Sequence, residues 1–423
     1  MSLRLVRPED RRYPALRSTY TTAGAPAAIA LPESAAEVAA AIAHGRERGL
    51  DIAVRSGGHG LAGTSTNRGG LVIDLSALHD VAVADPAARL VRVGAGARWA
   101  DVAAALHPHG LAISSGDHGN VGVGGIATGG GVGWLARWYG LTIDHVRAAE
   151  VVLADGRIVR ADAEHDPELL WAVRGAGAGA GIVTAFEIEA ARVRDVGVAQ
   201  LLVAADQDGA ALRRWASALR EAPRELTSEV IMLHNGRSPV MRVTAVVAGG
   251  DPRRVREIVE PLRRIGKVLD HRVDRAPYPV LLPPSHKHPN VAQQPVTITN
   301  GLLPAMDGDA AEAVMALVRS GRALVQLRSL GGAIHDVDRG ATAYPHRHQH
   351  TLVLASMFPP DGRAELDAAW RVLAGRVDGA YGNFEGRRDR PAFARVYPGP
   401  TGERVAAAWR RYDPGAVFRP YPI

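Results

Sequence analysis

Two glycine-rich stretches are the first places in this chain whose residue types suggest chemistry. The shorter is Arg55-Ser-Gly-Gly-His-Gly60, and the longer runs from Gly116 to Gly133. Successive small residues let backbone N–H groups turn toward one point, and the resulting anion nest suits a pyrophosphate. Because glycine costs about 0.5–1 kcal/mol per position in a regular element, such stretches indicate backbone that closely approaches a flat or charged ligand. The alternative is that both are flexible loops and bulges.

Neither stretch matches the common nucleotide-binding motifs. The sequence contains no Gly-x-x-x-x-Gly-Lys-Ser/Thr, and no clean Gly-x-Gly-x-x-Gly opens a helix after the first strand. These observations disfavour a P-loop nucleotidase and a simple Rossmann enzyme.

A second group of chemically capable side chains alternates along one short segment. Tyr344, His346, His348 and His350 are spaced by two residues, so on a strand all four would project from one face. Such a row could line a substrate pocket, supply a cation to a neighbouring group, or bind a metal. Imidazole is a common zinc ligand, but no carboxylate is placed to complete the set, so we predict no metal site.

The elements that would position these residues are short and mixed in the first half of the chain. An alanine-rich helix with an acidic first turn is predicted over 32–42, ahead of Gly49. Residues 150–159 resemble a hairpin in which Asp155 and Gly156 would form a type I′ turn. Strands are predicted over three further segments, 50–55, 71–75 and 90–93.

The second half contains less glycine. Residues 278–295 are proline-rich and predict an irregular, extended excursion, with His286 and His288 at the surface or in a loop. The chain as a whole is predicted to be α+β. The other predicted elements are helices over 208–222, 251–265 and 395–411 and strands within 228–247 and over 352–357.

Composition and charge limit the classes of function. With 423 residues the chain can form about two to three domains. Apolar residues make up 47%, and no apolar run reaches the ~18 residues of a membrane span. The net charge is +6, but basic and acidic residues interleave and aromatic residues are only 5%, which disfavours a nucleic-acid surface. Without cysteine or an apolar leader, a cytoplasmic protein is expected.

Several short motifs follow one another in an order that resembles one family. They are Arg55-Ser-Gly-Gly-His59, Asp74-Leu-Ser76, Val91-Arg-Val-Gly-Ala-Gly96, Val121-Gly-Val-Gly-Gly125, Gly129-Gly-Gly131, Gly140-Leu-Thr-Ile-Asp144, Leu170-Trp-Ala-Val-Arg-Gly175, Gly181-Ile-Val-Thr184, Arg328-Ser-Leu-Gly-Gly-Ala333, Ala341-Thr-Ala-Tyr-Pro-His-Arg347, Tyr381-Gly-Asn-Phe384 and Arg411-Tyr-Asp-Pro414. The chain is thus similar to the vanillyl-alcohol-oxidase/p-cresol-methylhydroxylase (PCMH-type) flavoproteins, specifically to their berberine-bridge-enzyme-like branch.

The resemblance implies FAD that is bound covalently through His59 to the 8α-methyl group of the flavin. Many relatives carry a second link from a cysteine. His118 stands at that position and the chain has no cysteine, so a single link is implied, with His118 either near the ring or filling space. The positions that match the family's FAD contacts are Arg55, Ser56, Gly57, Gly58, His59, Gly60, Ser65, Gly116, His118, Val121, Gly122, Gly124, Gly125, Gly129, Val183 and Asn383.

Other positions bear on the reaction or depart from the family. A small residue at Val121 accompanies oxidases, so the resemblance favours O2 as the electron acceptor. Ile126 stands where doubly linked relatives often have a histidine. Gly179 and Ala180 stand where relatives tend to have Asn and Phe, which changes the contacts expected near the adenine.

The family's catalytic base is matched by Tyr381 in Tyr-Gly-Asn-Phe. A tyrosinate can accept a proton if a nearby cation or hydrogen bonds lower its pKa from about 10. Asn383 would point toward the flavin, and His346 and His348 are candidates for the cation or for pocket lining. The alternative for Tyr381 is a buried tyrosine with a satisfied hydroxyl.

The resemblance therefore predicts a PCMH-type FAD-binding domain over 1–195, a substrate domain of antiparallel sheet covered by helices over 196–375, and a segment 376–423 that returns to the FAD domain. The expected activity is an oxidase that transfers a hydride from a small alcohol, phenol or amine-type natural-product intermediate to FAD and then to O2. A flavin-scaffolded cyclase without net redox turnover is the alternative, and a basic surface-binding module is a third reading. A monomer or homodimer without nucleic acid or membrane is expected.

Overall fold

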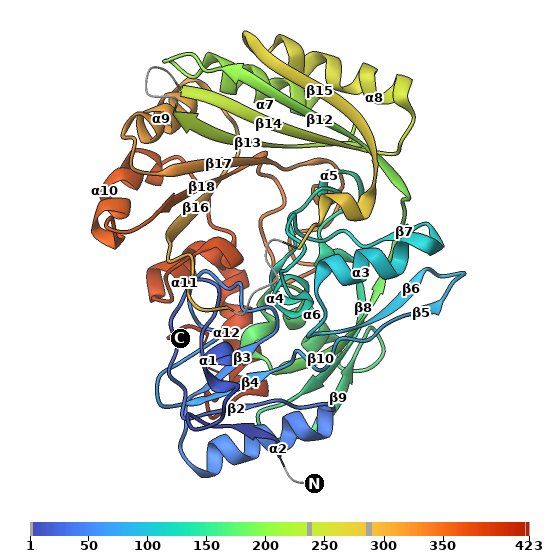
Figure 1. The fold of residues 1–423 in the computed structure, drawn as a ribbon, viewed down its shortest axis with the longest axis vertical. Helices are drawn as coiled ribbons and strands as arrows, with labels where there is room; N and C mark the ends of the chain where they lie inside the picture. Colours follow the sequence, from blue (N-terminus) through green and yellow to red (C-terminus); the bar gives the residue numbers. More distant parts are fainter. Residues whose placement is uncertain (1–2, 235–238, 285–289, 419, 423) are drawn as a thin grey trace.

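The computed structural model describes residues 3–234, 239–284, 290–418 and 420–422, so His286 and His288 lie outside the described residues. Figure 1 shows two parts along the long axis of the molecule. One part contains the N-terminal half and the C-terminal helices, and the other is a broad sheet with helices on its far face. Among the helices described, none is long and apolar enough to cross a membrane.

The shorter glycine stretch directly follows a strand of the first sheet. Its strand order is β1-β2-β4-β3, with β2 and β3 parallel to β4, and the chain leaves β3 at Arg55. The predicted helix over 32–42 is confirmed as α2, which begins after Ser34 because Ser34 Oγ accepts a hydrogen bond from Glu37 N. The bounds are β1 Leu5–Val6, α1 Tyr13–Leu16, β2 Ala28–Ala30, α2 Ala35–Glu47, β3 Ile52–Arg55 and β4 Leu71–Asp74.

The second sheet is antiparallel, with the order β5-β6-β10-β8-β9. The predicted hairpin is present between β8 and β9, but the type I′ turn is wrong. That turn requires positive φ at both central residues, and here Gly156 (φ 90°) has one while Asp155 does not. The bounds are β5 Val81–Asp85, β6 Leu90–Gly94, α3 Trp99–Leu106, β7 Leu111–Ala112, α4 Val123–Gly129, α5 Ala136–Tyr139, β8 Val146–Val152, β9 Ile158–Ala161, α6 Pro167–Ala176, β10 Ile182–Glu189 and β11 Ala191–Arg192.

The third sheet has seven antiparallel strands in the order β15-β12-β14-β13-β17-β18-β16. Alternate residues of its strands pack against α7, α9 and α10 on one face, while Leu302, Leu352 and Leu354 on the other face pack near Tyr381. The bounds are β12 Asp195–Ala204, α7 Ala210–Glu221, β13 Leu226–His234, β14 Pro239–Ala248, α8 Pro252–Val259, β15 Val268–Pro277, β16 Thr297–Leu303, α9 Gly308–Arg319, β17 Leu324–Ser329, β18 Thr351–Met357 and α10 Arg363–Ala374. This sheet therefore roofs the N-terminal part.

The C-terminal segment returns to the N-terminal part. The single helix predicted over 395–411 is wrong, because the chain forms α11 (Arg390–Val396) and α12 (Pro400–Tyr412), which are separated at Gly399 with φ 56°. Trp409 of α12 is buried and donates from its indole nitrogen to Ala176 O of α6 at 2.8 Å. A Cβ on Gly179 would lie 2.5 Å from that indole ring. The glycine that departs from the family pattern thus makes room for Trp409.

Replacing this tryptophan should separate the C-terminal segment from its support. The Trp409→Ala variant is expected to lose about 3–5 kcal/mol of unfolding free energy, because it leaves a cavity and an unpaired carbonyl at Ala176. Urea unfolding measures the change. Trp138→Ala, on a partly buried ring, is the matched control and should cost less.

Candidate functional site

The two glycine stretches lie directly against each other. A Cβ on Gly57 would lie 2.2 Å from the Gly122 nitrogen, and a Cβ on Gly122 would lie 2.1 Å from Ser56 Oγ. Ser56 Oγ donates to Ala95 O at 2.6 Å and accepts from Gly124 N at 3.3 Å. Glycine is needed here because any side chain would force the two backbones apart.

Beyond this contact, the surroundings of the glycines differ. Gly125 is exposed, and no described atom lies within 4 Å of the place where its Cβ would stand. The Cβ of Gly60 would meet Ser65 Oγ at 3.3 Å, and that of Gly116 would meet Ile126 Cδ1 at 2.9 Å. We call the surface formed by residues 56–60 and 116–129 the glycine cradle. Its closely apposed backbone, open at Gly60 and Gly125, fits a large, flat cofactor such as FAD.

Two of the predicted FAD contacts, Arg55 and Val183, lie outside the cradle, whereas Val121 lies within it. Arg55 is buried, and its Nε donates to Asp74 Oδ2 at 2.7 Å, so its side chain supports the loop from inside. Val183 is 5% exposed and lies on β10, at a bulge that interrupts the pairing with β8. Val121 is half-buried, and its carbonyl accepts from Trp99 N at 3.1 Å.

Each glycine stretch brings one imidazole to the same place. The ring centroids of His59 and His118 lie 5.4 Å apart, with the planes tilted by 47°. Tyr20 stacks on His59 at 4.8 Å. Gly58, with φ 69°, makes the turn that precedes His59, and a side chain is disfavoured in that conformation.

The hydroxyl of Tyr381 accepts two hydrogen bonds. Gly131 N and Asn383 Nδ2 both donate to it at 2.8 Å. Asn300 fixes the backbone of this tyrosine, accepting from Tyr381 N at 2.7 Å and donating to Tyr381 O at 3.1 Å. A Cβ on Gly130 would lie 2.6 Å from the phenol ring. Two donors directed at one phenolic oxygen favour the phenolate over the phenol.

Asn383 connects this tyrosine to the glycine cradle. Its Nδ2 also donates to Gly125 O at 3.2 Å, and a Cβ on Gly129 would lie 2.3 Å from its Oδ1. Asn383 and Gly129 therefore contact each other, and the Tyr381 hydroxyl is held at the C-terminal end of α4.

A buried cation lies beside Tyr381. Burial raises the pKa of Tyr381 above its usual value, and the hydrogen bonds from Gly131 and Asn383 and the charge of Arg328 offset this rise only in part. The Arg328 guanidinium lies 4.9 Å from the centre of the Phe384 ring, which in turn lies 5.2 Å from the Tyr381 ring. Sequence reasoning missed Arg328 as the cation. The available signal was an arginine inside the otherwise largely apolar strand β17.

The predicted row from Tyr344 to His350 is wrong, because these residues form no strand. His346 is buried, its Nε2 bonds Val396 O at 3.0 Å, and burial lowers its pKa to about 4, so its ring is neutral near pH 7. The ring of His348 is about half exposed and pairs with Asp378 at 2.9 Å. Neither histidine supplies the cation beside Tyr381.

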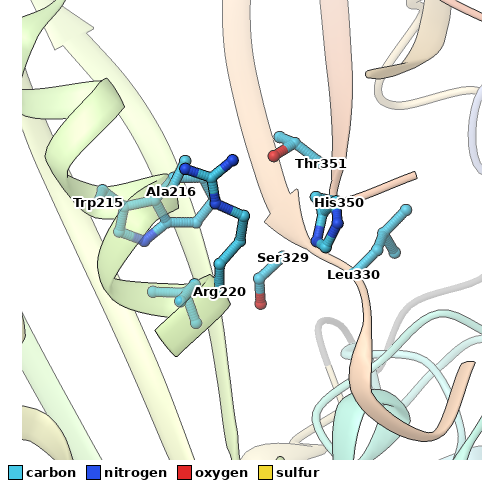
Figure 2. Close-up of a pocket in the computed structure, with 8 residues that line it drawn as sticks. Trp215, Ala216, Arg220, Ser329, Leu330, His350 and Thr351 are labelled. Carbon is cyan, nitrogen blue, oxygen red and sulfur yellow. The ribbon is translucent and has the colours of Figure 1, made fainter. Parts of the chain in front are cut away.

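His350 belongs to a separate pocket. Figure 2 shows its ring opposite Arg220, between α7 and the adjoining ends of β17 and β18. The pocket is lined by Trp215, Ala216, Leu219, Arg220, Ser329, Leu330, His350 and Thr351. In the described part of the chain, no group of three or more His, Asp or Glu residues could hold a metal ion.

Comparisons with known proteins agree with this geometry. Residues 26–162 match the FAD binding domain family. Over 164 residues the chain is 40% identical to (R)-6-hydroxynicotine oxidase of Paenarthrobacter nicotinovorans, a match that covers 39% of this chain and 36% of that protein. The matched stretch thus spans only about a third of the length of the first curated relative.

Two solved structures agree with the whole fold. The crystal structure of 6-hydroxy-D-nicotine oxidase from Arthrobacter nicotinovorans has a TM-score of 0.86 at 26% identity, over 100% of this chain and 97% of that chain. BBE-like 1 of Physcomitrella patens has a TM-score of 0.89 at 23% identity, over 100% of this chain and 96% of that chain. The predicted α+β class, with a PCMH-type domain and a helix-covered antiparallel sheet, is confirmed. The chain therefore carries an FAD-binding domain over residues 26–162, and the whole chain has the fold of 6-hydroxy-D-nicotine oxidase and of BBE-like 1.

Proposed function

We propose that this chain is an FAD-dependent oxidase that takes a hydride from a small alcohol, phenol or amine-type natural-product intermediate and delivers the electrons to O2. The observation that carries the proposal is the Tyr381 hydroxyl, which accepts two hydrogen bonds beside the Arg328 charge and next to the glycine cradle. A tyrosine held in this way is suited to become a general base, because the two donors and the cation stabilise its phenolate.

The protein's part in the reaction is to bind the substrate and to remove a proton. The glycine cradle would hold FAD, which would supply the acceptor for the hydride, and O2 would take up the two electrons and two protons to give hydrogen peroxide. Tyr381 accepts the proton from the substrate O–H or N–H, so that the substrate loses two electrons in total. Gly131 N, Asn383 Nδ2 and the Arg328 guanidinium stabilise the phenolate form that Tyr381 needs for this transfer, against the burial that raises its pKa.

We propose His59 as the single covalent anchor of FAD. A glucooligosaccharide oxidase of the same fold, from Acremonium strictum, carries a 6-S-cysteinyl, 8α-N1-histidyl FAD. This chain lacks cysteine, and His118, which stands where the cysteine is expected, lies 5.4 Å from His59. The cradle glycines would hold the cofactor from one side, while Arg55 supports the loop and Val183 backs it from the sheet.

The remaining expectations are kept as proposals. We divide the chain into the FAD domain 1–195, the substrate domain 196–375 and the returning segment 376–423, because α12 packs on α6 of the N-terminal part. We also propose a cytoplasmic monomer or homodimer that uses neither nucleic acid nor a membrane. The Val121 position favours O2 as acceptor.

Absorption spectroscopy tests the cofactor directly. The purified protein should show flavin bands, and the colour should remain with the pellet after acid precipitation because the FAD is covalently attached. A colourless protein that takes up no added FAD would contradict the proposal and favour a basic surface-binding module.

The cyclase alternative is separated from the oxidase by one experiment, anaerobic mixing with a substrate that yields product in air. Bleaching of the flavin bands indicates hydride transfer. Product without bleaching indicates that the flavin only shapes the site, an outcome that Ile126 and the missing cysteine leave open.

A further inference from the structure

Two carboxyl groups from different elements hold Arg328. Asp117 Oδ2 lies 2.5 Å from Arg328 Nη2, and Glu229 Oε2 lies 3.5 Å from Arg328 Nε. Asp117 belongs to the longer glycine stretch, whereas Glu229 lies directly opposite Arg328 in the pairing of β13 with β17. The side chains of Arg328, Glu229 and Asp117 are 11%, 13% and 25% exposed, so solvent screens their charges only weakly.

Both carboxyl groups thus face the same guanidinium in a largely buried site. Two carboxylates beside one cation leave an uncompensated negative charge, and this favours a proton on one of them. The charged groups that face Glu229 are Arg328, Asp117 and the more exposed Arg242 of β14. Burial and Asp117 raise the pKa of Glu229 to about 7, against the lowering effect of the two arginines. One proton is therefore held in this cluster under mildly acidic conditions.

We propose that Asp117 and Glu229 share a single proton across Arg328, and that this pair positions the guanidinium and sets the net charge that Tyr381 experiences. The inference rests on the function proposed above for Tyr381. Arg328 reaches Tyr381 through Phe384, whose ring lies 4.9 Å from the guanidinium carbon and 5.2 Å from the phenol ring. Asp117, Glu229 and Arg328 are called the charge triad below.

The charge triad makes the base sensitive to pH in a defined direction. With one proton on the carboxyl pair, the triad is neutral overall. When that proton is lost as the pH rises through about 7, a second carboxylate opposes Arg328 and the triad becomes negative. A negative neighbour disfavours the phenolate, so the pKa of Tyr381 rises. The rate of proton removal by Tyr381 therefore stops increasing as the pH is raised further.

Infrared spectroscopy tests the shared proton without any flavin chemistry. The wild-type protein, compared at pH 6 and pH 9, should show a carbonyl band of a buried protonated carboxyl group that disappears at the higher pH. Both Glu229→Gln and Asp117→Asn should abolish this band, whereas Glu257→Gln, on the exposed side of α8, should retain it. A wild-type protein without the band, or a band that persists in both variants, would overturn the inference.

The pH dependence of flavin bleaching tests the effect on Tyr381. In rapid anaerobic mixing, the bleaching rate of the wild-type protein should show a break near pH 7, and in Glu229→Gln the rate should rise through this region without the break. Glu257→Gln should behave as the wild-type protein does. An unchanged break in both Glu229→Gln and Asp117→Asn contradicts the inference. If no substrate bleaches the flavin while the infrared band behaves as expected, the proposed function fails and the shared proton stands.

Discussion

The Tyr381→Phe variant should retain covalent FAD and reduce it with substrate about 10²–10⁴-fold more slowly than the wild-type protein, the usual contribution of general base catalysis. The substitution removes one oxygen from a ring that is fixed by its neighbours. Gly130 leaves room for only the flat ring, and Phe384 and Tyr344 pack edge-on against it at 5.2 Å and 6.0 Å. Phenylalanine can occupy the same place, but it cannot take up a proton.

Stopped-flow measurement of flavin bleaching gives the rate of this step alone. Tyr397→Phe is the matched control, since Tyr397 is also buried and its hydroxyl donates to Gly175 O at 3.0 Å. The control should lose roughly 1 kcal/mol of stability with the hydrogen bond and keep its bleaching rate. If Tyr381→Phe bleaches as fast as the wild-type protein, Tyr381 is not the base.

Asn383→Leu should raise the pKa of Tyr381, because it removes one of the two donors to the phenolic oxygen. The lost stabilisation of the phenolate should shift the rising limb of the pH–bleaching profile to higher pH. At a sufficiently high pH the variant should recover much of its rate, which Tyr381→Phe cannot do. A fall in rate that is the same at every pH would contradict this role for Asn383.

The sequence predicted those parts of the site that depend only on neighbouring residues along the chain. A glycine stretch after a strand predicts close approach by another group, and in the loop after β3 Gly57 lies directly against Gly122. The cation beside Tyr381 could not be predicted from neighbouring residues in this way. Asp117, Glu229 and Arg328 come from a loop and two strands that only the sheet register brings together.

The error at His346 and His348 had a visible cause in the sequence. Pro345 stands inside the alternating row, and proline cannot donate to a strand ladder, so it argues against a strand there. The chain instead turns His346 inward to Val396 and leaves His348 at the surface. Spacing by two residues predicts a common face only where the strand itself is secure.

Gly179, which stands where relatives tend to have Asn, was misinterpreted for a different reason. A missing side chain in a motif looks like a lost ligand contact, but here the space is taken by Trp409 from more than two hundred residues later in the chain. No local pattern links these positions, because their contact depends on the return of α12 to α6. Motif matching cannot predict that a side chain from a distant segment fills the space that a glycine leaves open.

The attachment of the cofactor gives the other large expected effect. His59→Ala should lose all flavin from the protein on acid precipitation, because the proposed anchor is the only one. The cradle glycines remain in the variant, so FAD should still bind reversibly, and its occupancy should then depend on the concentration of added FAD.

His118→Ala is the control that the structure offers, since its ring lies 5.4 Å from His59 and comes from the other glycine stretch. This control should keep its covalent flavin. The opposite result, with flavin lost from His118→Ala and retained by His59→Ala, would move the bond to the position that a cysteine occupies in relatives and would make the longer glycine stretch the anchoring one.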